Sequence, residues 1–148
     1  MTDDIAQNLA QVRARMDAAA GRAHRSPDEI VLVAVSKTMP LERLRQAYAA
    51  GQRHFGENRV QEAEAKITAW TGERPVWHLI GRLQRNKARR AAQLFDMIHS
   101  VDSVDLARAL DRHAGEAGRA LPVLLEVNVA GEASKGGFAP GEGFAAAV

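Results

Sequence analysis

The sequence predicts an α/β fold, in which a parallel sheet is built from strands that alternate with helices. Short apolar runs recur at intervals of roughly 20 to 27 residues. Between these runs lie segments whose apolar residues have the three- and four-residue spacing of amphipathic helices. Glycine or proline marks several of the boundaries. Strands that alternate with helices in this way pair in parallel through right-handed crossovers.

The first part of the chain is expected to form a helix, a turn and a strand. Residues 4–24 carry a helical apolar stripe, and Gly21 is a candidate end for this helix. The segment 26–29, Ser-Pro-Asp-Glu, predicts a turn. Residues 30–35, IVLVAV, form the continuous apolar run that is typical of a strand buried on both faces.

Four more strands with their helices are expected to follow. Pro40 suits the first position of a helix, and Gly51 is a good stop for it. The later strands are expected at 53–56, 76–80, 97–99 and 122–129. The helices between them are expected at 58–70, at 86–95, and from a Ser103 cap to a break at Gly115 and Gly118. A glycine-rich loop at 131–143 leads into the start of one more helix.

Two architectures fit this order, an open doubly wound sheet and part of an eight-fold barrel. The GxGxxG fingerprint of dinucleotide-binding folds is missing after the first strand. A complete (β/α)8 barrel typically needs about 250 residues, whereas this chain has 148. Its last residues, GFAAAV, resemble a helix that is interrupted. We therefore expect residues 1–148 to form a single, partial domain.

Composition narrows the classes of function. No apolar run approaches the roughly 18 residues that a membrane span needs, and the N-terminus lacks the basic start and apolar stretch of a signal peptide. Cysteine is absent, which excludes disulfides and thiolate metal sites. The net charge of +2 does not indicate a nucleic-acid partner. We expect a cytoplasmic, monomeric protein without a membrane partner.

Polar residues stand at the ends of all five predicted strands, where barrels collect their functional groups. Lys37 is the most informative of them. An amine that lies along an apolar strand end is partly desolvated, which frees it to attack aldehydes. From position alone, a lysine that extends from the strand into water is the favoured interpretation. The strand-end residues in order are Ser36, Lys37, Gly56, Glu57, Asn58, His78, Gly81, His99, Ser100 and Asn128.

The other strand-end residues have equally simple structural explanations. Glu57 and Asn58 stand at a predicted helix start, where they suit capping. His78 shares a strand face with Val76 and Ile80, so a hydrogen-bonded core histidine and a ligand are both compatible with it. No second histidine or carboxylate stands at metal-ligand spacing from His78, so no metal site is predicted.

The segment GRLQRNKARR carries five positive charges in nine residues, from Arg82 to Arg90. It is compatible with an anion or nucleic-acid site or with a solvated helix face. No aromatic residue for stacking on bases lies among these charges, which favours the solvated face. Lys135, in the segment EASKGGF, is expected to be a surface charge on a loop.

Five segments together resemble the pyridoxal-phosphate homeostasis protein family. They are VAVSKTMP, FGENRVQEAEAKI, WHLIGRLQRNK, IHSVDS and LEVNVAGEASKGGF, and they occur in the family's order over residues 30–138. The resemblance implies a TIM (β/α)8-type barrel of the alanine racemase N-terminal kind. Here the barrel is expected to be truncated to about five βα units plus an N-terminal helix.

The resemblance also implies the cofactor and its site. It implies pyridoxal 5'-phosphate (PLP), held as a Schiff base on Lys37, with Asn58, His78 and Asn128 near the cofactor. The family's phosphate-binding segments lie further towards the C-terminus than this sequence extends. PLP-dependent apo-enzymes are the expected recipients of the cofactor.

Three functions are therefore weighed. The leading one is a PLP carrier for intracellular homeostasis without catalysis. The second is a fold-type III PLP-dependent enzyme such as an amino-acid racemase, which needs acid/base groups on both faces of its substrate. In related racemases the second base is a tyrosine of another domain, whereas Tyr48, the only tyrosine here, lies on a helix stripe. A basic nucleic-acid module, based on the Arg82–Arg90 segment, is the remote third.

Overall fold

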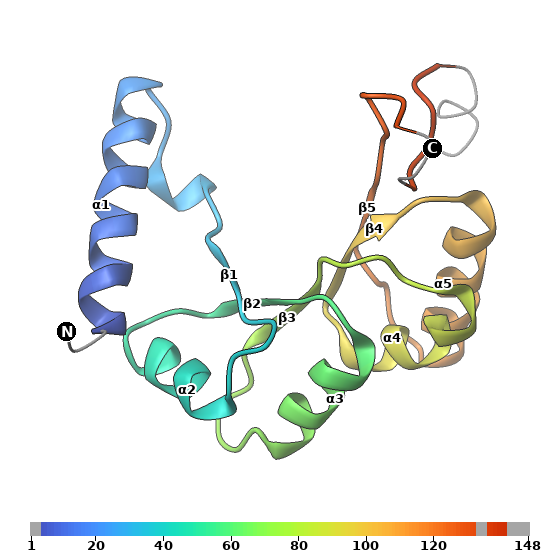
Figure 1. Cartoon of the computed structure of the whole chain (residues 1–148), viewed down its shortest axis with the longest axis horizontal. Coiled ribbons are helices and arrows are strands. Elements are labelled where there is room, and N and C mark those ends of the chain that lie inside the picture. The colour runs from blue at the N-terminus through green and yellow to red at the C-terminus, as the bar shows by residue number, and fades with distance from the viewer. Residues whose placement is uncertain (1–3, 133–135, 142–148) are drawn as a thin grey trace.

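Five parallel strands form one curved sheet in the order β1-β2-β3-β4-β5. The computed structural model describes residues 4–132 and 136–141. Every strand pairs with the next strand along the chain (Figure 1). The strands are β1 Val33–Val35, β2 His54–Glu57, β3 Val76–Leu79, β4 Met97–Val101 and β5 Val123–Leu125.

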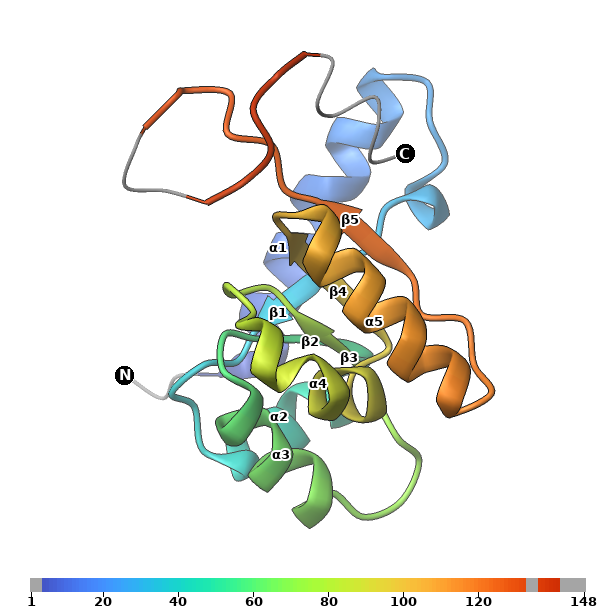
Figure 2. The ribbon, with the colours of Figure 1, turned by 90° about the vertical axis from the view of Figure 1, so that its right-hand side faces the viewer.

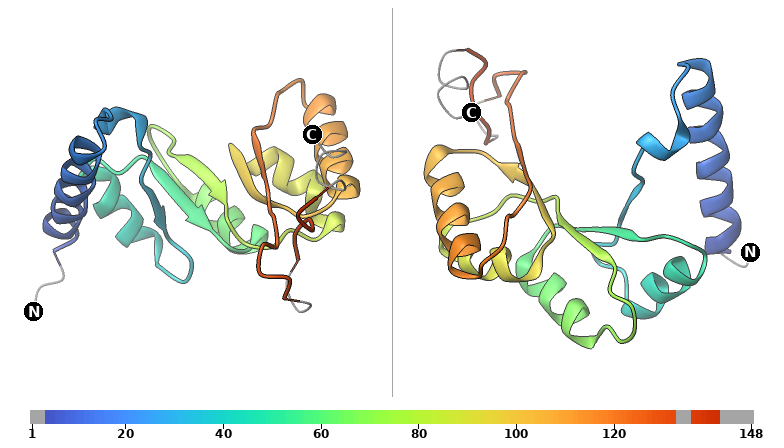
Figure 3. Two further views of the ribbon diagram at one scale, coloured as in Figure 1. Left: turned by 90° about the horizontal axis from the view of Figure 1, so that it is seen from above. Right: turned by 180° about the vertical axis from the view of Figure 1, so that it is seen from behind.

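The helices that connect the strands lie on one side of the sheet. Figure 1 and the view from behind in Figure 3 show α2, α3, α4 and α5 along the outer side of the arc of strands. A doubly wound sheet carries helices on both faces, so the sequential strand order and one-sided helices identify an arc of a barrel. The helices are α1 Ile5–Arg22, α2 Leu41–Ala49, α3 Val60–Ala69, α4 Ala88–Leu94 and α5 Val104–Glu116.

The helix α1 precedes the sheet and packs against α2. Its first turn is capped by Asp4, whose carboxylate accepts from the backbone N–H groups of Ala6 and Gln7 at 3.0 and 3.2 Å. Arg13 ties it to the end of α2 through a bond from Nη1 to the carbonyl of Ala50 at 3.0 Å. In the part of the chain that the structure describes, no helix is long and apolar enough to cross a membrane.

The hydrophobic core fills the layer between the sheet and its helices. Phe55, Trp77 and Ile98 project from the strands and are 0–1% exposed. The helices meet them largely with alanines, which let α3 and α4 approach the sheet closely. Figure 2 shows α4 and α5 side by side in front of the sheet. The fully buried alanines are Ala63, Ala88, Ala91 and Ala92.

The edge strands differ most from the prediction. The strand expected at 30–35 is Val33–Val35, and the strand expected at 122–129 is Val123–Leu125. Val31 and Val35 are 57% and 56% exposed, so the predicted burial on both faces is wrong. The reason is that β1 pairs on one side only within the described sheet, and an apolar run does not reveal whether its strand is central.

The predicted ends of α1 and α5 both lie within one or two residues of the observed ends, although the first glycine named for each end is still helical. Gly21 lies within α1, and Gly115 lies within α5, which ends at Glu116. Gly118 has a φ of +65° and follows the end of α5. Position 118, where the backbone is left-handed, therefore marks the true stop.

We predict that Gly81→Ala lowers the free energy of unfolding by about 1–3 kcal/mol. An added Cβ at position 81 would lie 2.7 Å from the Cα of Asn58, so the backbone after β2 must move. Gly115→Ala is the matched control, because nothing lies within 4 Å of its added Cβ. It removes a helical glycine and should raise stability by about 0.5–1 kcal/mol. Urea denaturation measures both changes, and equal stability of the two variants would contradict the predicted collision.

Candidate functional site

Lys37 lies in a tight turn at the carboxyl end of β1. The turn is closed by the N–H of Met39, which donates to the carbonyl of Ser36 at 3.1 Å. Thr38 has a φ of 63°, while Lys37 does not have a positive φ. This combination is that of a type II turn, whose third position favours glycine or asparagine. A β-branched threonine is strained there by about 1–3 kcal/mol, so other contacts must hold it.

The side chain of Lys37 is exposed. The partial desolvation of its ammonium expected for a reactive amine is therefore wrong for this structure, and the interpretation favoured from position alone, a lysine that extends from the strand into water, is confirmed. The cause is the edge position of β1, whose last residue, Val35, is itself 56% exposed. An exposed amine is accessible to a ligand on this side of the sheet, but burial does not explain its chemistry.

The strand register places the predicted site residues relative to one another. Lys37 follows the end of β1 and Asn58 follows the end of β2, so both lie at the carboxyl edge of the sheet. His78 stands within β3, two positions below that edge in the register. At the level of His78, the residues that pair from each strand to the next across β1 to β4 are Val35, Gly56, His78 and Met97.

His78 is the middle member of a chain of three histidines on neighbouring strands. Its Nε2 lies 2.9 Å from Nδ1 of His54, and its Nδ1 lies 2.8 Å from Nε2 of His99. Each of these histidines adjoins a core residue in sequence, so strand alternation places all three on the face away from the helices. His78 is 4% exposed and both of its ring nitrogens are engaged. Its contact with a cofactor stays a prediction.

Burial and neighbouring histidines keep the centre of this chain neutral. The pKa of His78 is lowered to about 4 because burial disfavours the imidazolium, and His99 and His54 add to the effect. Burial also lowers the pKa of His99. Within residues 4–132 and 136–141, no group of three His, Asp or Glu could hold a metal ion.

Glu57 does not cap the helix that follows it, contrary to the prediction. It is the last residue of β2 and is 0% exposed. The helix α3 begins three residues later, after Arg59, without a side-chain cap. Glu57 Oε1 instead accepts from Ser36 Oγ at 2.6 Å and from Lys66 Nζ at 2.7 Å. A tertiary partner, Lys66 of α3, decides its role, which the local capping pattern could not show.

The buried Lys66 is the functional candidate that the sequence analysis missed. Its side chain is 10% exposed, and Nζ donates to the carbonyl of Ser36 at 2.7 Å. It also donates to Glu57 Oε1 at 2.7 Å and to Glu62 Oε1 at 2.8 Å. A signal was present in the sequence, because Lys66 falls three residues after the buried Ala63 and four after Glu62. That spacing places it on the inner face of α3 beside a carboxylate.

Asn128 follows β5 and is engaged locally. Its backbone N–H donates to the carbonyl of Phe138 at 2.9 Å, and its Nδ2 donates to the carbonyl of Glu132 at 2.9 Å. These bonds fold the loop after β5 back on itself. The predicted proximity of Asn128 to a cofactor stays a prediction, and Lys135 lies outside the described residues.

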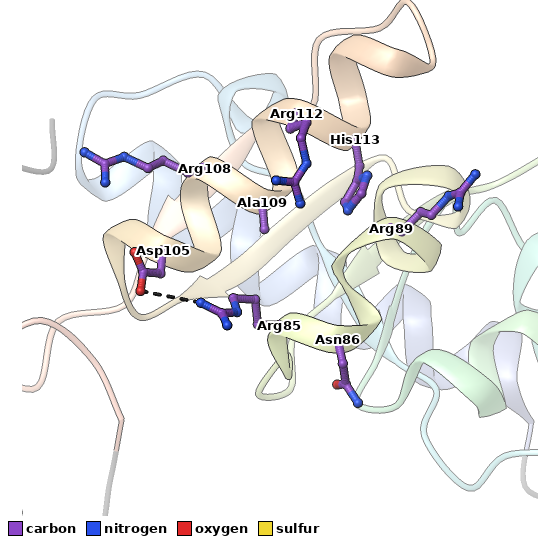
Figure 4. Close-up of a pocket in the computed structure, with 8 residues that line it drawn as sticks. All are labelled: Arg85, Asn86, Arg89, Asp105, Arg108, Ala109, Arg112 and His113. Atoms are coloured by element: carbon purple, nitrogen blue, oxygen red, sulfur yellow. Dashed lines mark ion pairs between the residues drawn. The ribbon is translucent and has the colours of Figure 1, made fainter.

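The basic segment is a solvated helix face in this structure. Arg90 forms an ion pair with Glu64 of α3, and Arg85 Nη1 lies 3.6 Å from Asp105 Oδ2 of α5. Arg85 is 71% exposed. Figure 4 shows that Arg89 and Arg108, on opposite sides of the groove between α4 and α5, extend away from each other. The guanidinium groups of Arg89 and Arg108 therefore do not converge on a common ligand position.

We predict that the histidine chain makes the free energy of unfolding decrease as the pH becomes acidic. Between pH 6.5 and about 4, the unfolded chain binds a proton at position 78 that the folded chain does not bind. The stability contributed by neutral His78 is complete above pH 6.5 and is lost as pH falls towards 4. His78→Gln should lose less stability over this window, measured by urea denaturation at each pH. His24→Asn, at an exposed histidine with a φ of 53°, is the control and should follow the wild type.

Comparison with known proteins shows what the chain resembles. The pyridoxal phosphate homeostasis protein of Escherichia coli (strain K12) is 46% identical over 141 residues, which cover 92% of this chain and 59% of that protein. The protein of the same name from Pseudomonas aeruginosa is 47% identical over 137 residues, with the same coverage. The chain thus spans 59% of the length of these relatives.

Solved structures agree with these relatives. PipY of Synechococcus elongatus PCC7942, solved without PLP, has a TM-score of 0.82 at 49% identity and covers 92% of this chain and 59% of that chain. PipY with PLP bound has a TM-score of 0.73 at 48% identity, with coverage of 92% and 58%. An alanine racemase of Clostridium difficile 630, at 15% identity and a TM-score of 0.70, shares the fold and covers 95% of this chain and 34% of that chain.

The arc of parallel strands, with its helices on one side, is therefore part of an alanine racemase-like barrel. A family profile described as "Alanine racemase, N-terminal domain" matches residues 2–148. That match extends over the whole sheet and over the turn that carries Lys37. The chain belongs to the alanine racemase N-terminal domain family.

Proposed function

We propose that this chain is part of a PLP-binding protein that holds the cofactor covalently on Lys37 and serves PLP homeostasis in the cytoplasm. The single observation that carries the proposal is the place of Lys37, an accessible amine in a defined turn at the carboxyl edge of β1. Relatives at 46–47% identity are named pyridoxal phosphate homeostasis proteins, and PipY has been solved with PLP bound. These likenesses support the choice of cofactor.

The residues at this edge suit such a cofactor. When bound, PLP supplies an aldehyde whose carbon condenses with a lysine amine, with loss of one water molecule. The exposed amine of Lys37 is accessible for that bond. Asn58 is half-buried at the same edge, where its amide offers both a donor and an acceptor. Gly81 approaches the backbone of Asn58 closely, and this contact fixes the position of the Cα from which the Asn58 side chain extends.

The surroundings of Tyr48 do not suit the second base that a racemase needs. Its hydroxyl donates to Glu73 Oε2 at 2.9 Å, and its ring packs edge-on against Trp70 at 5.3 Å between centroids. The guanidinium of Arg53 lies 4.1 Å from the ring centroid. Tyr48 therefore packs on the helix layer and is not available as a second base on the opposite face of a substrate. We propose that PLP-dependent apo-enzymes receive the cofactor from this carrier.

We predict that Lys37 is the lysine that PLP modifies. The sequence has only four lysines, at positions 37, 66, 87 and 135. Treatment with PLP and sodium cyanoborohydride, followed by peptide mass spectrometry, should place the pyridoxyl group mainly on Lys37. Lys37→Ala should abolish most of the label, and also most of the visible absorbance that bound PLP gives before reduction, while Lys87→Ala should retain both. A label that persists elsewhere in Lys37→Ala at the wild-type level would refute the assignment.

Protein that is incubated with PLP and not reduced tests the enzyme alternative. A carrier should interconvert alanine enantiomers no faster than free PLP does at the same concentration. Chiral analysis of alanine after incubation with the PLP-treated protein measures this rate. A rate well above that of free PLP, and lost in Lys37→Ala, would favour a racemase.

A further inference from the structure

We propose that Glu62 and Lys66 of α3 are positioning residues for Lys37, because they hold the peptide groups on both sides of it. This inference rests on the function proposed for Lys37. Glu62 and Lys66 are one helical turn apart and form an ion pair of 2.8 Å. Neither is assigned a contact with the cofactor, and both act on Lys37 through its backbone.

Lys66 holds the peptide group that precedes Lys37. Its Nζ donates to the carbonyl of Ser36 at 2.7 Å, and this carbonyl belongs to the Ser36–Lys37 peptide bond. The same oxygen accepts the N–H of Met39, which closes the turn, so both of its lone pairs are used. The turn therefore cannot rotate its first peptide group without breaking a bond to a buried ammonium.

Glu62 holds the peptide group that follows Lys37. Its Oε1 accepts the backbone N–H of Thr38 at 2.5 Å, and this N–H belongs to the Lys37–Thr38 peptide bond. The bonds from Lys66 and Thr38 are the two largest causes that lower the pKa of Glu62, so the acceptor is the carboxylate. This bond also stabilises the left-handed backbone of Thr38, which a threonine disfavours.

The two contacts from Glu62 and Lys66 to the peptide groups that flank Lys37 are here called the clamp. The clamp is anchored in the core, which makes it rigid. Glu57 is fully buried and shares its Oε1 between Lys66 and the hydroxyl of Ser36. Ser36 is itself paired to β2 through its backbone N–H, which donates to Gly56 at 2.9 Å. The direction in which the Lys37 side chain leaves the sheet is therefore determined by α3 and β2 together.

An ion pair with only a structural role could join α3 to the sheet wherever the two are in contact. Here the two contacts reach the two peptide groups that flank one residue, and that residue is the exposed lysine at the candidate site. A lysine that must meet an aldehyde held elsewhere in a barrel gains rate from a fixed origin, because small misplacements of reacting groups cost large factors. The geometry thus assigns the pair a role in orientation.

The test uses Glu62→Ala, because Glu62 has a side chain that is 28% exposed and its loss leaves the Lys66–Glu57 pair intact. Glu62→Gln is the conservative variant, since its amide oxygen can still accept from Thr38. Glu64→Ala, on the same helix, removes the ion pair with Arg90 and is the matched control. Lys66→Met is the second variant, and circular dichroism reports whether it folds.

Two measurements are made on each variant. Hydrogen exchange of the Thr38 amide needs no cofactor, and it should become about tenfold faster in Glu62→Ala. Trapping with PLP and sodium cyanoborohydride gives the rate of labelling at Lys37 relative to Lys87, and this ratio should fall about tenfold. Glu62→Gln should recover most of both values, and Glu64→Ala should match the wild type.

The outcomes separate this inference from the proposed function. If the wild type labels Lys37 and Glu62→Ala labels it at the same relative rate, the positioning role is wrong while the role of Lys37 stands. If the wild type shows no preference for Lys37, both proposals fail. Unchanged exchange at Thr38 in Glu62→Ala would also overturn the clamp, whatever the labelling shows.

Discussion

The arrangement of the carboxyl edge depends on one buried ammonium group, that of Lys66. Removal of such a charge from water is strongly unfavourable unless it is paired and hydrogen-bonded. Lys66 meets this requirement with three acceptors, one from the turn after β1, one from β2 and one from its own helix. Because the three acceptors come from three elements, the requirement to satisfy one charge fixes their relative positions. A hydrophobic contact of equal size would not specify those positions as narrowly.

The two faces of the sheet are organised by different forces. The helix side is held by apolar burial, with Phe55, Trp77 and Ile98 almost fully excluded from water. The other side carries a hydrogen-bonded chain of imidazoles from β2, β3 and β4. Burial of apolar area is non-directional, whereas hydrogen bonds between side chains fix distance and angle. The polar face is therefore the one suited to present groups at defined positions.

Local pattern in the sequence was sufficient for the type and order of the elements and for the strand-end position of Lys37. It failed where the outcome depends on partners far away in the chain. The exposure of Val31 and Val35 depends on which strand lies beside β1, and an apolar run carries no information on that. Glu57 matched a capping pattern, yet its carboxylate instead accepts a hydrogen bond from Lys66, nine residues later. The role of His54 in the histidine chain depends on the strand register that places it beside His78.

The two lysines near the candidate site differ in burial and in the hydrogen bonds that their amines make. Lys66 is the buried one, yet all three of its ammonium hydrogens are donated, so its nitrogen has no free position for a new bond. Lys37 is exposed, and its flanking peptide groups are held on both sides. Under the role proposed for Lys37, its selectivity would come from where its backbone is fixed and not from removal of water around its amine. The buried lysine supplies the fixed geometry, and the exposed lysine supplies the free amine.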